Sequence, residues 1–475
     1  MFCCRPQSIP LSKGVKTIMK RILKRSTLIL LFTLLFIGGA SFFCVELVVN
    51  ADSWANQPYN AHISGNGGLE QAGAIYDRNG VVLAKTEDNR RVYNENQSIR
   101  TALLHTVGDN SLNISTAIQS KYRSLLTGYS LIWGLNMPQS LRTSHDLTLT
   151  VDANVSVAAY DVLSSYGKPG ACVVFNYKTG EVLGAVSTPT YDPESPPEIN
   201  ETNEKQYEGV YLDHVISSTY MPGSIFKLVT AVAAIENLPD LFSRTWYCAG
   251  SEQIGGSEVR CVDGEAHGTM DFNSAMQQSC NIVFAELAAE LGPDIMMATA
   301  EKMGINLSYE IDDVSTAKGH YDVKQASLNE LAWSGVGQFN DEVNPMQMAV
   351  MCGAIANGGN SVTPTYIKSG TGDLLKMIGL HDTKSLQLVN PNTAATLTQV
   401  MPTYTFGSVN VRAKTGTAEV GNGKGNNAWM VGFSTDADCP VAFACVVEDS
   451  GFGNQYARPV LEAAVQATAD SLRGK

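Results

Sequence analysis

One uncharged segment near the N-terminus constrains the chain before any motif is considered. From Ser26 to Val45 the sequence carries no charged side chain and is rich in Leu, Ile and Phe. A helix of about 20 residues is about 30 Å long, which is the thickness of the hydrocarbon core of a bilayer. We therefore expect a membrane anchor over residues 27–49, with a cleaved signal peptide as the alternative. No second apolar run of this length occurs, so we expect a single crossing.

Charge asymmetry indicates how this segment is oriented. The residues before it carry seven basic side chains and no acidic one. These are Arg5, Lys13, Lys16, Lys20, Arg21, Lys24 and Arg25. Positive flanks stay on the cytoplasmic side, so residues 1–26 are predicted to be a cytoplasmic head and the remainder to be extracytoplasmic. The remainder holds 26 basic against 46 acidic residues. That balance argues against a nucleic-acid partner, because phosphate binding requires clustered Lys and Arg.

The ten cysteines give weaker information. Cys248 and Cys261 flank a Gly-rich stretch that is typical of a hairpin loop, and a disulfide between them is one option. No CxxC or HxxxH spacing occurs, which disfavours a metal site, so neither a metal nor another cofactor is expected. His267 stands beside Gly268, and a structural role in a turn is preferred to a catalytic one.

The pattern of apolar residues predicts an α+β chain with a boundary near residue 150. A small extracytoplasmic domain is expected over 50–150, beginning with a polar linker over 51–72, and a larger domain follows over 151–475. In the small domain, 74–84 reads as strand, Asn-Gly turn and strand. Helices are expected at 153–163, 224–237, 270–291, 344–356 and 458–472, and strands at 171–175, 182–186, 427–434 and 440–448. The two groups of strands would have to meet in one antiparallel sheet covered by helices.

The first chemical motif is Ser224-Ile225-Phe226-Lys227. Pro222 and Gly223 allow a tight entry, and an apolar helix follows, so Ser224 is placed in the first helical turn. Lys227 lies one turn further on the same face, within reach of the Ser224 hydroxyl. A desolvated amine can act as the base that a serine nucleophile needs. Ser315-Thr316-Ala317-Lys318 has the same letters but no apolar helix behind it.

The second and third motifs supply polar groups that can assist such a serine. Ser279-Cys280-Asn281 lies between two apolar helical stretches, although the triplet that begins at Ser327 has the same pattern. Lys414-Thr415-Gly416-Thr417 follows a strand-like approach. Gly416 lets a substrate lie against the backbone, and the N–H groups of Ser224 and Thr417 could form an oxyanion hole. The earlier Lys178-Thr179-Gly180 is interpreted as a hairpin turn.

In this order the three motifs resemble those of penicillin-binding proteins and their β-lactamase relatives. Residues 150–475 look like the transpeptidase domain of class B penicillin-binding proteins, and 73–110 look like the membrane-proximal pedestal domain of that class. The likeness extends to 170–192, 335–338, 344–347 and 427–433, and the run from His267 to Asn281 favours Ser279 over Ser327. Two positions depart from the family pattern, Ala72 before Gly73 and Phe339 after Gln338. The implied fold is the α+β penicillin-binding transpeptidase fold with a helical subdomain, a pedestal and one transmembrane helix.

The resemblance also implies a mechanism. Lys227 would accept the proton of Ser224, which would attack the D-Ala-D-Ala carbonyl of a peptidoglycan stem peptide. D-Ala would leave with help from Ser279, and an amine from a neighbouring strand would resolve the acyl-enzyme. β-Lactam antibiotics would acylate the same serine. Lys414 belongs to the implied catalytic set, and the implied substrate-binding residues are Asn281, Thr415, Gly416 and Thr417.

The implied partners are stem peptides, the lipid-linked precursor and a glycosyltransferase of the shape, elongation, division and sporulation (SEDS) family. Division, elongation and sporulation are not distinguished by the sequence. A D,D-carboxypeptidase and a non-catalytic cell-wall scaffold remain alternatives. A β-lactamase is disfavoured, because the best match to its Glu-x-x-Leu-Asn water-activating motif is Gln325 to Asn329, and an amide cannot act as a base. A β-lactam sensor is disfavoured because the cytoplasmic head has no room for a signalling domain.

Overall fold

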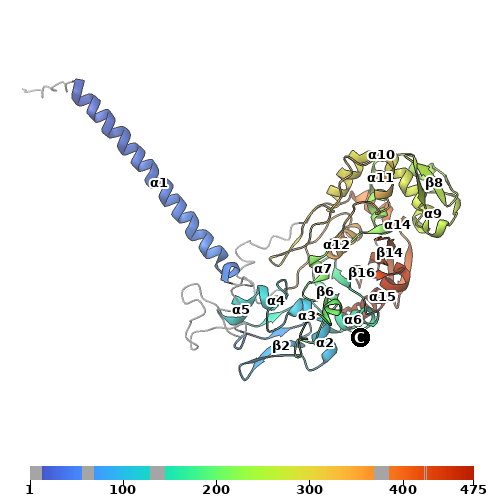
Figure 1. The fold of residues 1–475 in the computed structure, drawn as a ribbon, viewed down its shortest axis with the longest axis horizontal. Coiled ribbons are helices and arrows are strands. Elements are labelled where there is room, and N and C mark those ends of the chain that lie inside the picture. The colour runs from blue at the N-terminus through green and yellow to red at the C-terminus, as the bar shows by residue number, and fades with distance from the viewer. Residues whose placement is uncertain are drawn as a thin grey trace, which may run out of the picture.

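The computed structural model describes residues 13–55, 69–128, 145–368, 385–421, 423 and 425–474. Its first element is one long helix, α1 (Lys13–Ala55), which extends away from the body of the molecule (Figure 1). Within α1 the stretch Ile18–Leu47 is long and apolar enough to cross a membrane, and its most apolar window is not buried inside the molecule. The predicted anchor, 27–49, lies inside this helix. Most of the predicted 51–72 linker lies outside the described residues.

A small domain built on a four-stranded sheet follows. Its strands are β1 (Ile75–Tyr76), β2 (Val82–Glu87), β3 (Arg90–Tyr93) and β4 (Leu147–Thr148), in the order β3-β2-β1-β4. Its helices are α2 (Gln97–Ala102), α3 (Leu104–Val107), α4 (Ile118–Lys121) and α5 (Arg123–Thr127). β1 and β2 pair antiparallel around Gly80, which has φ of 84°. The predicted strand-turn-strand unit is therefore confirmed.

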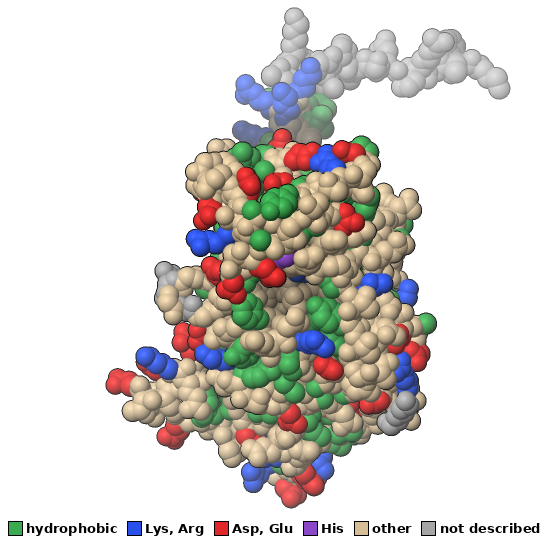
Figure 2. All heavy atoms as spheres, turned by 90° about the vertical axis from the view of Figure 1, so that its right-hand side faces the viewer, with side chains coloured by type: hydrophobic (Ala, Val, Ile, Leu, Met, Phe, Trp, Pro, Cys, Tyr) green, Lys and Arg blue, Asp and Glu red, His purple; other side chains and the backbone are tan. Residues whose placement is uncertain are grey.

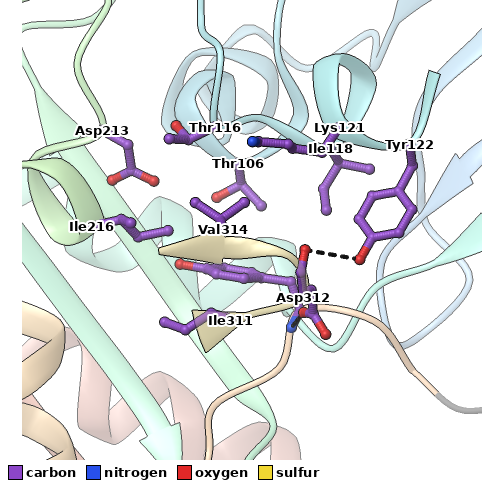
Figure 3. A pocket seen from close by; sticks show the side chains of 11 residues that line it. Thr106, Thr116, Ile118, Lys121, Tyr122, Asp213, Ile216, Ile311, Asp312 and Val314 are labelled. Carbon is purple, nitrogen blue, oxygen red and sulfur yellow. Dashed lines mark hydrogen bonds between the residues drawn. The ribbon is translucent and has the colours of Figure 1, made fainter. Parts of the chain in front are cut away.

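Polar contacts join this domain to the rest of the chain. Arg100 forms a bidentate ion pair with Asp192, with both N···O distances at 2.6 Å, and both side chains are largely shielded from solvent. Figure 3 shows a pocket at this junction, lined from both sides; there the Tyr122 hydroxyl donates to the Asp312 carbonyl oxygen at 3.1 Å. A bidentate Arg–carboxylate pair fixes orientation as well as distance. The two parts therefore meet in a defined orientation.

The larger part is organised around a six-stranded sheet in the order β13-β14-β15-β16-β5-β6. The strands are β5 (Gly170–Asn176), β6 (Val182–Thr188), β13 (Thr403–Phe406), β14 (Val409–Ala418), β15 (Asn426–Ser434) and β16 (Val441–Ser450). All neighbours are antiparallel. β16 pairs with β5 from Val441 opposite Asn176 to Val447 opposite Gly170. The expected meeting of the early and late strands is confirmed.

Helices cover both faces of this sheet, which explains why its central strands are apolar without interruption. Phe175, Val431 and Ala444 point toward the core that contains α8 (Lys227–Asn237) and α12 (Pro345–Ala356). Their neighbours in sequence, Val174, Met430 and Phe443 among them, point toward α6 (Ala153–Ser165) and α15 (Gly453–Leu472). Successive side chains of a strand point to opposite faces, so both alternate sets must be apolar here.

A helical lobe stands beside the sheet (Figure 1, upper right). Its helices are α9 (Phe272–Gln277), α10 (Asn281–Lys302) and α11 (Leu328–Ser334), and its short strands are β7 (Trp246–Cys248), β8 (Ser251–Ile254), β9 (Ser257–Arg260) and β10 (Gly268–Met270). The remaining elements are β11 (Glu310–Ile311), β12 (Val314–Ser315), α7 (His214–Ser217) and α14 (Pro391–Val400), with single 3-10 turns at Glu204–Tyr207, Gly223–Phe226, Leu241–Ser243 and Val262–Gly264.

The single helix expected over 270–291 is two helices. α9 ends at Gln277, and α10 begins at Asn281 and continues to Lys302. The break lies at Ser279, whose φ of +55° is incompatible with a right-handed helix. The second motif therefore occupies a sharp turn between two helices, which agrees with its expected position between two apolar helical stretches.

Buried Asn344 connects the start of α12 and the segment that precedes the first motif. Its amide nitrogen donates to the carbonyl oxygens of Val215, Ile216 and Ser218 at 3.1, 3.0 and 2.8 Å. Its side-chain oxygen accepts from the backbone N–H of Gln347 and so caps α12. A fully satisfied buried amide positions the chain that it contacts. These hydrogen bonds fix the backbone of residues 215–218, which precede Ser224 by a few positions in the sequence.

Candidate active site

The candidate nucleophile lies in a tight turn between the sheet and α8. Ser224 belongs to the 3-10 turn Gly223–Phe226, which leads directly into α8. Gly223 has φ of +56°, and its N–H donates to the carbonyl oxygen of Gly337 at 2.9 Å. A methyl group on Gly223 would lie 2.7 Å from the carbonyl oxygen of Thr417. Only glycine fits here, and the turn is therefore pressed against β14.

Lys227 is the first residue of α8, and its side chain is fully buried. Its Nζ lies 3.0 Å from the Ser224 Oγ and 3.1 Å from the Ser279 Oγ. Two shorter contacts, each 2.6 Å, join Nζ to the carbonyl oxygen of Ser279 and to the Asn281 Oδ1. This one amine therefore connects the first motif to the second.

These four contacts indicate how the amine is used. The Ser279 carbonyl and the Asn281 Oδ1 can only accept hydrogen bonds, so they take two N–H groups of Lys227. The Asn281 amide cannot be reversed, because its Nδ2 donates to the Arg260 carbonyl oxygen at 2.9 Å. A neutral amine has two N–H groups and one lone pair. With both N–H groups used, the lone pair is left for a hydroxyl proton.

Burial makes a neutral amine accessible near neutral pH. Desolvation lowers the pKa of Lys227 to about 7, with the sulfur atoms of Cys280 and Cys261 acting weakly in the opposite direction. Lys414 is also fully buried, and desolvation, followed by repulsion from Lys227, holds its pKa well below the usual lysine range. A group with a lowered pKa in a polar cluster is suited to proton transfer.

Ser279 sits between the two lysines. Its Oγ accepts from the Lys414 Nζ at 2.7 Å and lies 3.1 Å from the Lys227 Nζ. Its left-handed backbone conformation turns its own carbonyl oxygen toward Lys227. Non-glycine residues held in this region are a form of strain that recurs at functional sites. The hydroxyl of Ser279 can therefore pass a proton between two amines.

The third motif occupies β14, and residues beyond Ala413 have one open edge. β13 pairs only with Val409–Arg412, whereas β15 pairs with Val411–Ala418. Among the described residues, 414–418 thus pair on one side only and face the nucleophile turn on the other. Gly416 is opposite Trp429, and the Trp429 Nε1 donates to the Met221 carbonyl oxygen at 3.0 Å. This contact fixes the turn against the sheet.

The structure brings the predicted catalytic residues into one hydrogen-bonded network. Ser224, Lys227, Ser279, Asn281 and Lys414 are linked directly, and Thr415, Gly416 and Thr417 lie on the adjoining strand. Sequence reasoning missed the carbonyl of Arg260 and the approach of Gly337 to Gly223. Backbone groups leave no residue-type signal, although Gly337 lies in a stretch whose likeness to the family was noted.

The repeated motifs have structural roles. Ser327 caps α11 in a reciprocal capping box, and the Asn329 amide holds the β8–β9 turn. Lys178-Thr179-Gly180 is the β5–β6 turn, with Gly180 at φ of +82°. Ser315 bonds Glu310 on the neighbouring strand. The interpretation of Lys178-Thr179-Gly180 as a hairpin turn is therefore confirmed.

A broad groove adjoins the nucleophile turn. Its walls include Tyr220 and Met221 just before Ser224, Val420 and Asn427 at the β14–β15 end, and Glu342. Figure 2 shows a face on which the helical lobe and the lower body are separated by a hollow. Lys and Arg side chains are scattered singly on this face. The groove thus opens beside the residues that precede Ser224 and beside the β14–β15 end.

Comparison with known proteins agrees with this geometry. The penicillin-binding protein transpeptidase domain model matches residues 170–466, more than half of the chain. Peptidoglycan D,D-transpeptidase PbpA of Mycolicibacterium smegmatis is 29% identical over 364 residues, which are 67% of this chain and 71% of that protein. Penicillin-binding protein 3 of Bacillus subtilis is 28% identical over 74% of this chain and 56% of its own length.

Solved structures give the same result. The crystal structure of PBPA from Mycobacterium tuberculosis has a TM-score of 0.69 and 25% identity, and the match covers 84% of this chain and 99% of that one. The penicillin G acyl-enzyme complex of the same M. tuberculosis protein gives equal values of TM-score, identity and coverage.

The backbone of Ser279 provides a test of the strained turn. We expect Ser279→Gly to be more stable than Ser279→Ala by about 1 kcal/mol, because alanine keeps the left-handed strain and glycine does not, after allowing for the greater freedom of unfolded glycine. Both variants lose the hydroxyl, so their difference reports the backbone alone. Urea unfolding followed by circular dichroism measures it. Equal stability, or a more stable alanine variant, would contradict the left-handed assignment.

Proposed function

The chain belongs to the family of penicillin-binding protein transpeptidases and is a peptidoglycan D,D-transpeptidase, and we propose that Ser224 is its nucleophile. The single observation that supports this role is the position of the Lys227 Nζ, 3.0 Å from the Ser224 Oγ. Its two strongest contacts are to oxygen atoms that can only accept, which leaves its lone pair for the Ser224 proton.

In the proposed acylation step, neutral Lys227 takes the Ser224 proton while Oγ attacks the carbonyl carbon of the penultimate D-Ala. The oxyanion is stabilised by the backbone N–H groups of Ser224 and Thr417. When the intermediate collapses, the C–N bond breaks and the amine of the terminal D-Ala needs a proton. Ser279 can supply it, because its hydroxyl contacts both Lys227 and Lys414 and can be reprotonated from either.

Deacylation reverses these roles. An amine from a second stem peptide enters, loses a proton through the same lysine-serine pair and attacks the ester carbonyl of the acyl-enzyme. The C–O bond to Ser224 breaks, and its oxygen regains a proton from Lys227. The product is a cross-linked peptide, and no group outside the chain is consumed.

Substrate recognition is assigned to β14 and Asn281. An extended peptide can add to the open edge at residues 414–418, where backbone groups and the hydroxyls of Thr415 and Thr417 are available. Gly416 removes a side chain at that edge. The terminal carboxylate of the substrate is placed near the Lys414 and Thr415 end of the strand.

Labelling with a fluorescent penicillin tests the nucleophile. We expect wild-type chain to become covalently labelled and Ser224→Ala to lose the label, because no oxygen remains to form the ester. Ser315→Ala is the matched control, because Ser315 begins the other Ser-x-x-Lys sequence of the chain. This variant should label as wild type does. Undiminished labelling of Ser224→Ala would overturn the assignment. A cross-linking assay with lipid-linked precursor then separates transpeptidation from release of free D-Ala by a carboxypeptidase.

The pKa of Lys227, about 7, predicts a pH profile. A lowered lysine pKa means that the neutral base predominates above pH 7, so the acylation rate should fall about tenfold per unit below that pH and level off above it. Lys414, Cys261 and Cys280 are the other titratable groups that face this amine. Stopped-flow acylation with a chromogenic β-lactam measures the profile. A rate independent of pH across this range would contradict a lysine base.

Replacement of the base provides the companion measurement. Lys227→Arg keeps a cation but cannot lose its proton, and it should slow acylation by about a hundredfold or more at every pH. Lys318→Arg, in the unused motif, should leave both rate and profile unchanged.

We also propose that α1 remains as a single anchor, with residues 1–26 cytoplasmic and the rest outside. The basic residues before the apolar stretch support this orientation. The proposed divisions are the anchor at 27–49, a pedestal at 50–150 and the catalytic domain at 151–475. A SEDS-family glycosyltransferase is the proposed membrane partner, contacting α1 or the pedestal. Its co-purification with the full chain, and its loss when α1 is replaced by an unrelated membrane helix, would support this partner.

Protease protection tests the topology. In intact protoplasts, added protease should digest residues 69–474 and leave a membrane-bound fragment that contains α1. Mass spectrometry of the untreated chain should still find residues 13–40. An N-terminus created near residues 38–41, with the chain released from the membrane, would instead indicate a cleaved signal peptide.

A further inference from the structure

A second group of chemically active side chains adjoins the turn that contains Ser279, because one of its members is Cys280. Cys248, Cys261, Cys280 and His267 place their ligand atoms within 4.8 Å of one another. Cys248 ends β7, Cys261 follows β9, His267 precedes β10 and Cys280 precedes α10. All three sulfur atoms are buried, and the imidazole side chain is only 6% exposed.

The distances in this cluster match one coordination geometry. The Cys248 and Cys261 sulfurs are 3.7 Å apart, and those of Cys261 and Cys280 are 3.8 Å apart. The His267 Nδ1 lies 3.4 Å from the Cys248 sulfur and 3.6 Å from that of Cys261. A tetrahedral zinc ion with Zn–S of about 2.3 Å and Zn–N of about 2.0 Å would place sulfurs about 3.8 Å apart, and sulfur and nitrogen about 3.6 Å apart.

A disulfide does not describe the cluster. The bond would bring two sulfurs to about 2.05 Å, whereas Cys248 and Cys261 are free thiols at 3.7 Å. It would also leave the third sulfur and the imidazole nitrogen without a role. Plain apolar packing of thiols does not require a ring nitrogen to face two sulfurs.

We propose that these four residues bind one structural Zn²⁺ ion through three thiolates and the His267 Nδ1. Sulfur-rich sites of this composition select zinc among the common divalent ions. Four protein ligands leave no open position, so the ion takes no part in the acyl transfer. On binding, each thiol releases its proton to solvent, and the imidazole binds through a nitrogen that carries no proton.

The surroundings suit such an ion. The His267 Nε2 points away from the sulfurs and lies 4.0 Å from the Glu265 carboxylate, which leaves Nδ1 as the ligand nitrogen. The backbone N–H groups of Asn281 and Ile282, at the start of the 22-residue helix α10, approach the Cys261 sulfur. Outer hydrogen-bond partners of this kind orient ligands and stabilise thiolates.

The proposed ion would stabilise the conformation of Ser279-Cys280-Asn281. Cys280 stands between Ser279 and Asn281, and Cys261 follows Arg260, whose carbonyl oxygen fixes the Asn281 amide. One ion would therefore hold both the strained turn and the strand end that orients Asn281. The sequence disfavoured a metal because CxxC and HxxxH spacings are lacking. The fold instead collects single ligands from four separate segments.

Metal analysis of the purified full-length chain tests this proposal, and its main readout does not depend on penicillin labelling. After passage over a chelating resin, inductively coupled plasma mass spectrometry should find about one zinc per chain. Cys261→Ser and His267→Ala should lose most of it. Cys352→Ser, at a buried free cysteine of α12, is the matched control and should keep it. His267→Cys supplies a fourth thiolate and should also keep it.

Cobalt substitution of the wild-type chain decides the question even if a variant fails to fold. Co²⁺ should produce thiolate-to-metal charge-transfer bands and the intense visible bands of tetrahedral coordination, both displaced by added Zn²⁺. Absence of these bands together with absence of zinc would overturn the proposal. So would unchanged zinc in both Cys261→Ser and His267→Ala, or a Cys248–Cys261 disulfide found by mass spectrometry in the chain as purified.

Discussion

Two lysine amines buried around one serine hydroxyl impose the main constraint on this molecule. The Ser279 Oγ lies 3.1 Å from the Lys227 Nζ and 2.7 Å from that of Lys414. Two ammonium groups that are this close and fully buried would repel each other and lose their hydration. The cluster therefore favours a state in which at least one of the two amines is neutral. The surrounding helices and strands exclude water and thereby maintain that state. The ground state of the site therefore favours a neutral amine beside the Ser279 hydroxyl.

This constraint also explains why the site needs three separate parts of the chain. Lys227 comes from the start of a helix, Ser279 from a turn between helices and Lys414 from the central part of a strand. Each supporting element is held by a different device: the Gly223–Gly337 contact, the Asn281–Arg260 bond and the pairing of β14 with β15. Rigid elements position such groups better than loops do, which fits their shared burial.

Local patterns predicted most of the helices and strands, and they selected the three motifs that the fold brings together. The apolar helix behind Ser224 and the strands at 171–175 and 182–186 are predicted from neighbouring residues alone, and the structure confirms them. The left-handed backbone of Ser279 was not predictable, because this conformation is stabilised by a contact with Lys227, 52 residues away. The gathering of Cys248, Cys261, His267 and Cys280 was missed for the same reason. Their closeness exists only after four segments have packed.

The pairing of β5 with β16 has a consequence for how the chain is made. β5 and β6 are synthesised early, yet β5 finds its second neighbour only when Val441 to Val447 become available. Until then one edge of the early hairpin has unpaired backbone groups, which is a hazard for association with other chains. The order of synthesis thus delays closure of the catalytic sheet to the last stage. A truncation that removes the final strands would therefore leave the nucleophile turn without the surface against which it packs.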